Sequence, residues 1–159
     1  MKTAIIYYSM SGNTATAAKK VAEGLHADLI EIKPVKAFPD KGFKKFLWGG
    51  KSAVMAEKPK LIPYQFDPEQ YDQIIIGFPV WASNVAPPIR TFAFESKEAI
   101  RNKKIAAFAC QGGSGAEKAF KKLSDCLEQD AFAATMILND PNSQAENDQA
   151  IASFLAKLA

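Results

Sequence analysis

The sequence has few cysteines and histidines, the residues that bind zinc and form disulfides. It contains two cysteines and one histidine among 159 residues. Cys110 and Cys126 have neither the spacing of a Cys-x-x-Cys redox pair nor that of a zinc site. We therefore expect no metal, two reduced thiols and a cytoplasmic location. His26 ends an expected helix, where a cation suits the helix dipole, so we assign it no catalytic role.

Long hydrophobic runs are absent as well. The first run, Ala4 to Tyr8, is too short for the core of a signal peptide, and no later run is long enough to span a bilayer. The formal net charge of +3 is mildly basic, and the basic residues do not form an aromatic RNA-binding signature. We therefore expect no membrane span and no nucleic-acid partner.

Several motifs of common enzymes and signalling domains are missing too. There is no Gly-x-Ser-x-Gly turn, which excludes the usual serine hydrolase. No Gly-Lys-Ser/Thr follows the first candidate loop, so this loop is not a Walker loop. A Cys-x5-Arg phosphatase loop is excluded because Ala116 stands where the arginine would be. The first expected strand ends in Tyr7 and Tyr8 and not in an acidic cluster, which argues against a phospho-receiver domain.

What the sequence does contain is a regular alternation of short apolar runs and segments of helical periodicity. It predicts strands at residues 4–8, 29–32, 74–78, 105–109 and 133–138, and helices at residues 13–25, 87–94, 116–127 and 142–158. Strands that are apolar without alternation indicate a parallel sheet with helices on both faces. We therefore predict one α/β domain over residues 1–159, with an irregular insertion at about residues 39–64.

Ligands of such sheets bind beyond the carboxyl ends of the strands, which directs attention to three loops. The first loop is rich in hydroxyls and opens a helix. Backbone N–H groups at a helix N-terminus, together with short hydroxyls and a glycine, can bind a phosphate without lysine or arginine. A plain helix cap is the alternative. The candidate residues of this loop are Ser9, Met10, Ser11, Gly12, Asn13 and Thr14.

The second and third loops follow the third and fourth expected strands. In the second, the flat ring of Trp81 is placed to stack on a planar ligand, the alternative being a tryptophan of the core. In the third, three glycines let the backbone approach a ligand edge and donate N–H groups, the alternative being a flexible turn. The candidates are Pro79, Val80, Trp81, Ala82, Ser83 and Asn84, and then Cys110, Gln111, Gly112, Gly113, Ser114 and Gly115.

Two of these loops resemble those of a known family. Ser9-x-Ser11-Gly12-Asn13-Thr14 directly after an apolar strand resembles the FMN phosphate loop of the flavodoxin family. Pro79-Val80-Trp81-Ala82 ahead of a Pro-Pro helix is similar to the loop that holds the isoalloxazine ring in short flavodoxin-like proteins. The resemblance covers nearly the whole chain. It implies a flavodoxin-like fold, with a five-stranded parallel sheet in the order 2-1-3-4-5, FMN as cofactor, and electron transfer with a redox partner protein.

Three departures from the family pattern keep a second function open. The third loop has no aromatic residue to cover the flavin, the chain is not acidic, and the second loop has Ala82 and Ser83 where many flavodoxins have a glycine beside the flavin N5. The alternative is an FMN reductase that uses NAD(P)H and a quinone or similar small acceptor. The insertion at about residues 39–64 combines lysines with aromatic residues, which predicts either a surface that faces a partner or substrate, or packing on the sheet edge.

Overall fold

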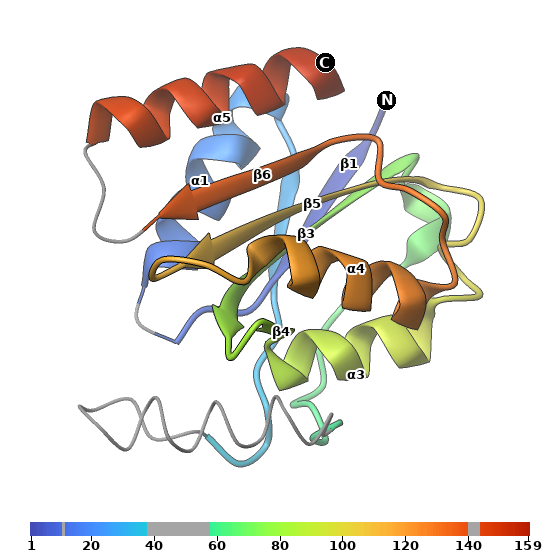
Figure 1. Ribbon diagram of the computed structural model, residues 1–159. Coiled ribbons are helices and arrows are strands. Elements are labelled where there is room, and N and C mark those ends of the chain that lie inside the picture. Colours follow the sequence, from blue (N-terminus) through green and yellow to red (C-terminus); the bar gives the residue numbers. More distant parts are fainter. Residues whose placement is uncertain (11, 38–57, 140–143) are drawn as a thin grey trace.

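A parallel sheet forms the centre of the protein. The computed structural model describes residues 1–10, 12–37, 58–139 and 144–159. The parallel strands lie in the order β2-β1-β3-β5-β6 (Figure 1). Counted along the chain, this is the predicted order 2-1-3-4-5, so the predicted topology is confirmed. The strands are β1 (Thr3–Tyr7), β2 (Asp28–Glu31), β3 (Gln73–Trp81), β5 (Lys104–Gln111) and β6 (Thr135–Asn139), and β4 (Asn84–Val85) pairs antiparallel with the end of β3.

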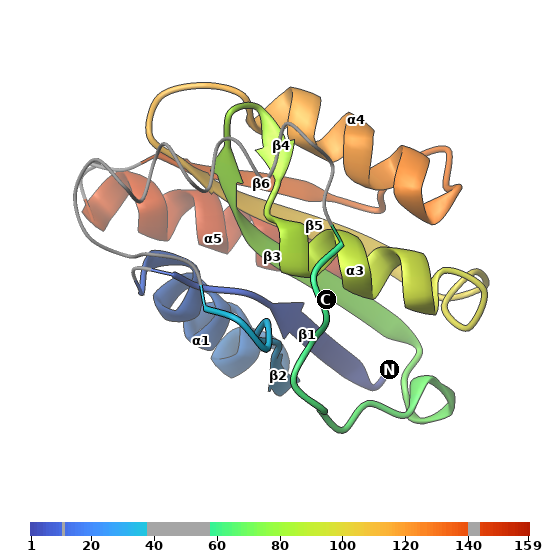
Figure 2. The same ribbon diagram turned by 90° about the horizontal axis from the view of Figure 1, so that it is seen from below.

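Helices cover both faces of this sheet, as predicted. Helices α1 and α5 lie on one face and α3 and α4 on the other (Figures 1 and 2). Their bounds are α1 (Asn13–Leu25), α3 (Pro87–Ser96), α4 (Ala116–Leu127) and α5 (Gln144–Leu158), and a short 3-10 helix, η1 (Pro68–Gln70), precedes β3. Among the described helices, none is long and apolar enough to cross a membrane.

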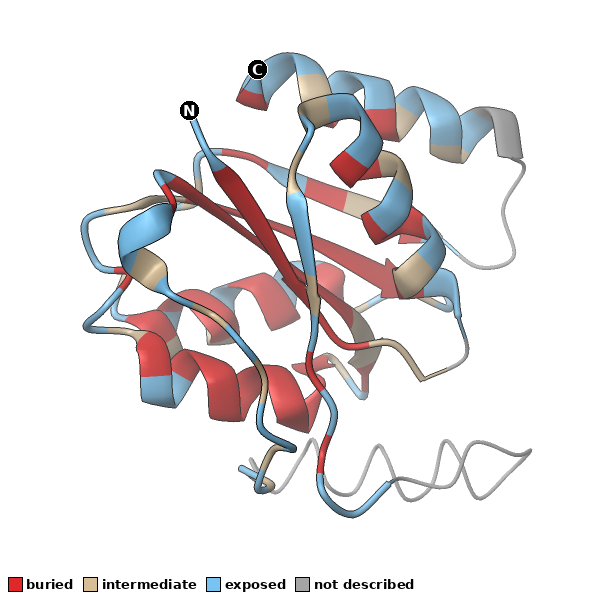
Figure 3. Ribbon diagram, turned by 180° about the vertical axis from the view of Figure 1, so that it is seen from behind, coloured by how far each residue is buried: buried red, intermediate tan, exposed pale blue. Residues whose placement is uncertain are grey.

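The core consists of two apolar layers, one on each face of the sheet. Successive residues of a strand point to opposite faces. Tyr7 therefore packs with α1 and α5, and Tyr8 packs on the side of α3 and α4. The central strands are buried along most of their length (Figure 3). Burial on both faces explains why these strands are continuously apolar, which is the pattern that made them predictable.

The predicted insertion is described only at its end, because residues 38–57 lie outside the described part of the chain. The prediction for that part therefore stays a prediction. Residues 60–62 run antiparallel to the residues that follow β2. The Val35 N–H donates to the Lys60 carbonyl and the Ile62 N–H donates to the Lys33 carbonyl, both at 2.8 Å.

Candidate functional site

The three candidate loops meet at one edge of the sheet, because the parallel strands that precede them end there (Figure 1). The rings of Tyr8, at the end of β1, and Trp81, at the end of β3, pack edge to face with centroids 5.9 Å apart. A Cβ added to Gly115 would lie 2.9 Å from the Cα of Ser83, so the third loop lies directly against the second. Residues more than 100 positions apart are thus brought into one region.

The hydroxyl of Ser9, the first residue of the first loop, holds this loop in shape. Ser9 Oγ accepts hydrogen bonds from the N–H groups of Gly12 and Ala15, both at 3.2 Å. Gly12 is the N-cap of α1 and has a φ of 97°, a conformation that glycine adopts without steric cost. A Cβ at Gly12 would meet no atom within 4 Å, so the space above it is open. Ser11, another candidate of this loop, lies outside the described residues.

Thr14 supplies an unpaired hydroxyl at this loop. It is 2% exposed, and its hydroxyl makes no hydrogen bond within the described part of the chain. Over the same residues, Gln73 Oε1 is the only side-chain polar atom that is both fully enclosed and without a partner. The Thr14 hydroxyl also lacks a partner, so it cannot be fully enclosed and must reach the surface. It does so in the first turn of α1, where the helix dipole favours an anion. This arrangement fits a phosphate group.

The second loop forms a β-hairpin, which the sequence did not indicate. Pro79, Val80 and Trp81 belong to β3, and a two-residue turn at Ala82 and Ser83 leads into β4. Ala82 has a φ of 50° and Ser83 a φ of 60°. Two successive left-handed residues define a type I′ turn, which normally uses Asn-Gly. The hairpin is not evident from the sequence, because Ala-Ser lacks this turn signal.

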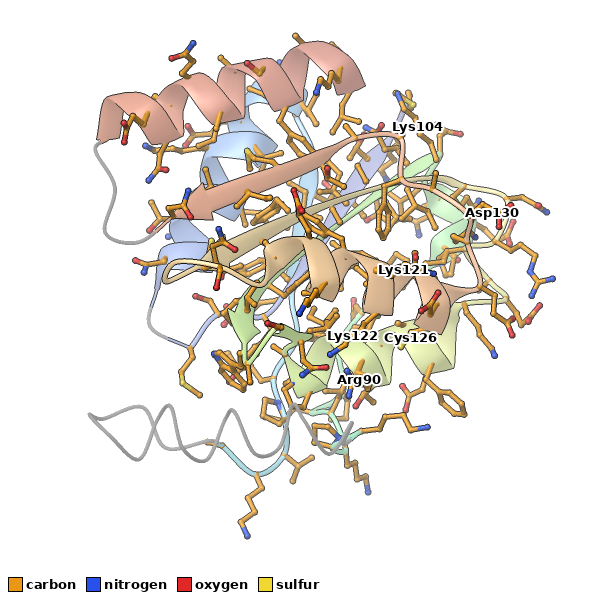
Figure 4. The ribbon with its side chains drawn as sticks, viewed as in Figure 1. Arg90, Lys104, Lys121, Lys122, Cys126 and Asp130 are labelled. Atoms are coloured by element: carbon orange, nitrogen blue, oxygen red, sulfur yellow. The ribbon has the colours of Figure 1, made fainter. Side chains whose placement is uncertain are left out.

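Two side chains hold this turn. Asn84 Nδ2 donates a hydrogen bond to the Ala82 carbonyl at 2.8 Å, and Lys122 Nζ donates one to Asn84 Oδ1 at 2.6 Å. Lys122 extends from α4 toward the hairpin (Figure 4). We call this pair the Asn84–Lys122 clamp. Lys122 was not among the sequence candidates, because no local pattern indicates that α4 carries a lysine to a turn 38 residues earlier.

Trp81 is buried. It is 8% exposed and belongs to the core layer on the side of α3 and α4. Its edge contact with Tyr8 is nearly perpendicular, with an interplanar angle of 88°. Burial raises the pKa of Tyr8 to about 12, so this phenol stays protonated at neutral pH. Trp81 is therefore a core residue at the rim of the site, and stacking on a ligand remains a prediction.

The third loop is shorter than predicted, because β5 continues through Gln111. Cys110 is a strand residue, buried in the layer of α1 and α5. Gln111 fixes the end of the loop, since its Oε1 accepts the N–H of Ala116 at 2.9 Å and its Nε2 donates to Asn139 Oδ1 at 2.7 Å. The Gln111 side chain thus caps α4 and is not free for a ligand.

The backbone of the third loop is still available for binding. The N–H groups of residues 112–115 make no hydrogen bond to the described part of the chain. Gly112, Gly113 and Ser114 are exposed, and a cavity of about 390 Å³ lies beside this loop. Ser83, Gln111 and Gly115 are among its lining residues. Unpaired N–H groups next to a cavity suit the polar edge of a flat ligand.

These features define a doubly wound α/β domain with a candidate ligand site at the carboxyl edge of the sheet and a candidate anion-binding loop at the start of α1. The chain belongs to the flavodoxin family, because the family model described as Flavodoxin matches residues 2–154. That match covers every described strand and the three candidate loops.

Solved structures with the same fold extend the comparison. The chain is similar to a flavoprotein from Lactobacillus acidophilus NCFM in complex with FMN, with a TM-score of 0.76 and 22% identity over 96% of this chain and 97% of that one. It is similar to the apo-form of the L. acidophilus flavoprotein, with a TM-score of 0.64 and 25% identity over 91% and 95%. Oxidised flavodoxin 1 from Bacillus cereus gives a TM-score of 0.59 and 19% identity over 99% and 96%.

Proposed function

We propose that this chain binds FMN at the carboxyl edge of its sheet and acts in electron transfer. The observation that carries the proposal is the Thr14 hydroxyl, which is nearly buried and unpaired within the described residues, in a first loop built around Gly12. That hydroxyl and the N-terminus of α1 would bind the phosphate. Family membership and the FMN complex of the L. acidophilus flavoprotein support the choice of cofactor.

The remaining candidates would hold the ring of the flavin. Trp81 would contribute the edge or face of its indole at the rim of the site, and the N–H groups of residues 112–115 would donate to the ring carbonyls. The hairpin at Ala82 and Ser83 would form the wall between them. The flavin supplies the redox chemistry, and the protein supplies binding and orientation. The partner in this function would be a redox protein.

One observation favours a second candidate, an FMN-dependent reductase that takes electrons from NAD(P)H and passes them to a small acceptor. In flavodoxins that carry single electrons, the resemblance implies a mobile glycine peptide beside the flavin. Here the Ala82 carbonyl is already bonded to Asn84, and Lys122 holds Asn84 in turn. A fixed turn suits the transfer of two electrons together better than the transfer of one.

The cofactor proposal is tested with a matched pair of threonine variants. Thr14→Val removes the unpaired hydroxyl at nearly constant volume, whereas the Thr16 hydroxyl is already bonded to the Gly12 carbonyl. Titration of the apoprotein should show FMN binding weakened about 10-fold in Thr14→Val, as expected for a lost hydrogen bond to a charged group, and little changed in Thr16→Val. Equal affinities in both variants, or binding of FAD as tight as FMN, would contradict the proposal.

The two functions are separated by two measurements on the FMN-loaded protein. Steady oxidation of NAD(P)H in the presence of a quinone would support the reductase. Dithionite titration should proceed in a single spectral step if the fixed turn disfavours one-electron chemistry, and in two well-separated steps if the protein is a one-electron carrier. Two steps without NAD(P)H oxidation would identify electron transfer as the function.

A further inference from the structure

A second cavity lies beside the first loop, away from the third. It has a volume of about 310 Å³ and is lined by Tyr8, Met10, Lys33, Pro34, Val35 and Ile62, among others. This volume is at the lower end of the range of about 300–1,000 Å³ that is usual for small-molecule sites. One wall is fixed by the two backbone hydrogen bonds between residues 33–35 and 60–62. We name this second cavity the Tyr8 cavity.

The Tyr8 hydroxyl is the polar group that distinguishes this cavity. Tyr8 is 5% exposed, and its hydroxyl makes no hydrogen bond within the described part of the chain. Over those residues, Gln73 Oε1 is the only side-chain polar atom that is both fully enclosed and unpaired. The Tyr8 hydroxyl is unpaired as well, so it is not fully enclosed in the core. Tyr8 lines the cavity, so the hydroxyl is open to it. A buried donor without a partner costs stability unless a ligand or water satisfies it.

The remaining side chains that line the Tyr8 cavity restrict the chemical class of ligand that it can bind. Met10, Pro34, Val35 and Ile62 are apolar, and Val35 and Ile62 are 58% and 45% exposed. Exposed apolar side chains around a hollow are typical of a site for an apolar ligand. The one lysine of the lining, Lys33, lies 3.7 Å from Glu31 Oε1, so a carboxylate stands beside its positive charge. A neutral and mainly apolar molecule fits these walls.

We propose that the Tyr8 cavity binds a neutral one- or two-ring aromatic carbonyl compound, with the carbonyl oxygen accepting a hydrogen bond from the Tyr8 hydroxyl. Because this phenol stays protonated up to strongly alkaline pH, it donates throughout the physiological range. The cavity shares Ser9 and Met10 with the first loop, and the Tyr8 ring touches Trp81. The ligand therefore lies beside the proposed flavin site and borders it at Ser9 and Met10.

The test uses two probes and two tyrosine variants in the FMN-loaded protein. 1-Tetralone is a two-ring aromatic ketone, and tetralin is the same bicycle without the oxygen. Tyr8→Phe removes the proposed donor. Tyr7→Phe is the control, because Tyr7 lies on the other face of the sheet and its hydroxyl is bonded to Glu31. Dissociation constants come from ligand-observed NMR titrations.

We expect one site for 1-tetralone in the natural protein. Tyr8→Phe should weaken 1-tetralone binding about 3- to 10-fold, the range for one neutral hydrogen bond, and leave tetralin binding within about twofold. Tyr7→Phe should change neither probe. Ile62→Trp, which fills the mouth of the cavity, should weaken both. Equal effects of the two tyrosine variants, absence of 1-tetralone binding, or displacement of FMN by 1-tetralone would overturn the proposal.

The test also separates this inference from the proposed function. If the protein fails to take up FMN, the proposed function is wrong. The same titration on the flavin-free protein then still decides about the cavity. Loss of 1-tetralone affinity in Tyr8→Phe, with tetralin unaffected, supports the cavity site in either case.

Discussion

The first loop and the β3–β4 hairpin are both sharp turns at the same edge of the sheet, but they reach left-handed backbone conformations in different ways. The first loop uses Gly12, with a φ of 97°. The hairpin uses Ala82 and Ser83, with φ values of 50° and 60°. Glycine adopts such conformations without steric cost, whereas other residues lose about 1–2 kcal/mol each. Gly12 therefore brings no left-handed strain into the first loop, whereas the hairpin depends on its surroundings.

Those surroundings are visible in the structure. The Asn84–Lys122 clamp bonds the turn from within, and Gly115 lets the third loop lie against Ser83. Backbone strain persists only where the surrounding structure over-determines it, and such places cluster at functional sites. An Asn-Gly sequence would form the same turn without this strain. The presence of Ala82 and Ser83 there therefore indicates that the contacts of the hairpin decide its conformation.

Replacing Gly115 with alanine should have the largest effect. Its φ is 102°, and the new Cβ would lie 2.9 Å from the Ser83 backbone. Left-handed strain and the clash together should lower the free energy of unfolding by about 2–4 kcal/mol. Gly12→Ala should cost only the strain, about 1–2 kcal/mol, because no atom lies within 4 Å of its Cβ.

Urea denaturation of the apoproteins measures these differences. Gly112→Ala is the control, because Gly112 has neither a positive φ nor a neighbour within 4 Å, and it should change stability by less than about 0.5 kcal/mol. If Gly115→Ala is no worse than Gly12→Ala, the third loop does not support the hairpin.

Trp81→Ala is expected to have the next largest effect, on the cofactor. Loss of stacking and of buried area should weaken FMN binding by about 1–3 kcal/mol. Because Trp81 is buried against Tyr8, the same variant should also lower the stability of the apoprotein. Fluorescence titration with FMN gives the dissociation constant. An unchanged constant with lowered stability would place Trp81 in the core alone.

The same contrast explains how much of the molecule could be predicted from the sequence. The sheet order and the helices follow from local patterns, because a strand buried on both faces must be continuously apolar and a covering helix must carry an apolar stripe. The first loop could be proposed as a phosphate site because its chemistry is local, and that role stays a prediction. Gly12, Asn13 and Thr14 are neighbours in the chain, and the glycine and the hydroxyl lie where the sequence indicated.

The hairpin could not be predicted, because the contacts that create it join distant parts of the chain. Ala82 and Ser83 have no intrinsic preference for a type I′ turn, and the residues that hold them in it include Gly115 and Lys122. The end of β5 was misjudged for a similar reason. Gln111 continues the strand because Asn139 of β6 pairs with it, and this pairing depends on the sheet order.

Ala82→Gly is a direct test of strain in the hairpin. Glycine removes the steric cost of the left-handed conformation, and part of that gain is offset by the greater freedom of the unfolded chain. The free energy of unfolding should rise by about 1 kcal/mol. Thermal and urea denaturation measure the change. Ala99→Gly is the control, because Ala99 is exposed and has no positive φ, so glycine there relieves no strain. Equal effects at the two positions would show that the turn stores no strain.

The smallest effect is expected for the outer half of the Asn84–Lys122 clamp. Lys122→Met keeps most of the side-chain volume but removes the donor to Asn84 Oδ1. The hydrogen bond joins a charged group to a buried amide, since Asn84 is 6% exposed, but the lysine itself is only half-buried. We expect a loss of about 0.5–1 kcal/mol in unfolding free energy. The neighbouring Lys121 provides the matched control, because its ion pair with Asp125 is exposed, with side chains 74% and 61% accessible.

Lys121→Met should cost no more than about 0.5 kcal/mol, as is usual for an exposed pair one helical turn apart. The two variants should differ in a second respect, because only Lys122 acts on the hairpin. Lys122→Met should also weaken FMN binding, since Asn84 then holds the Ala82 carbonyl less firmly, and Ala82→Gly in the same chain should restore most of the stability. If both lysine variants behave alike in stability and in FMN affinity, the hairpin holds its strained conformation through Gly115 and strand pairing alone.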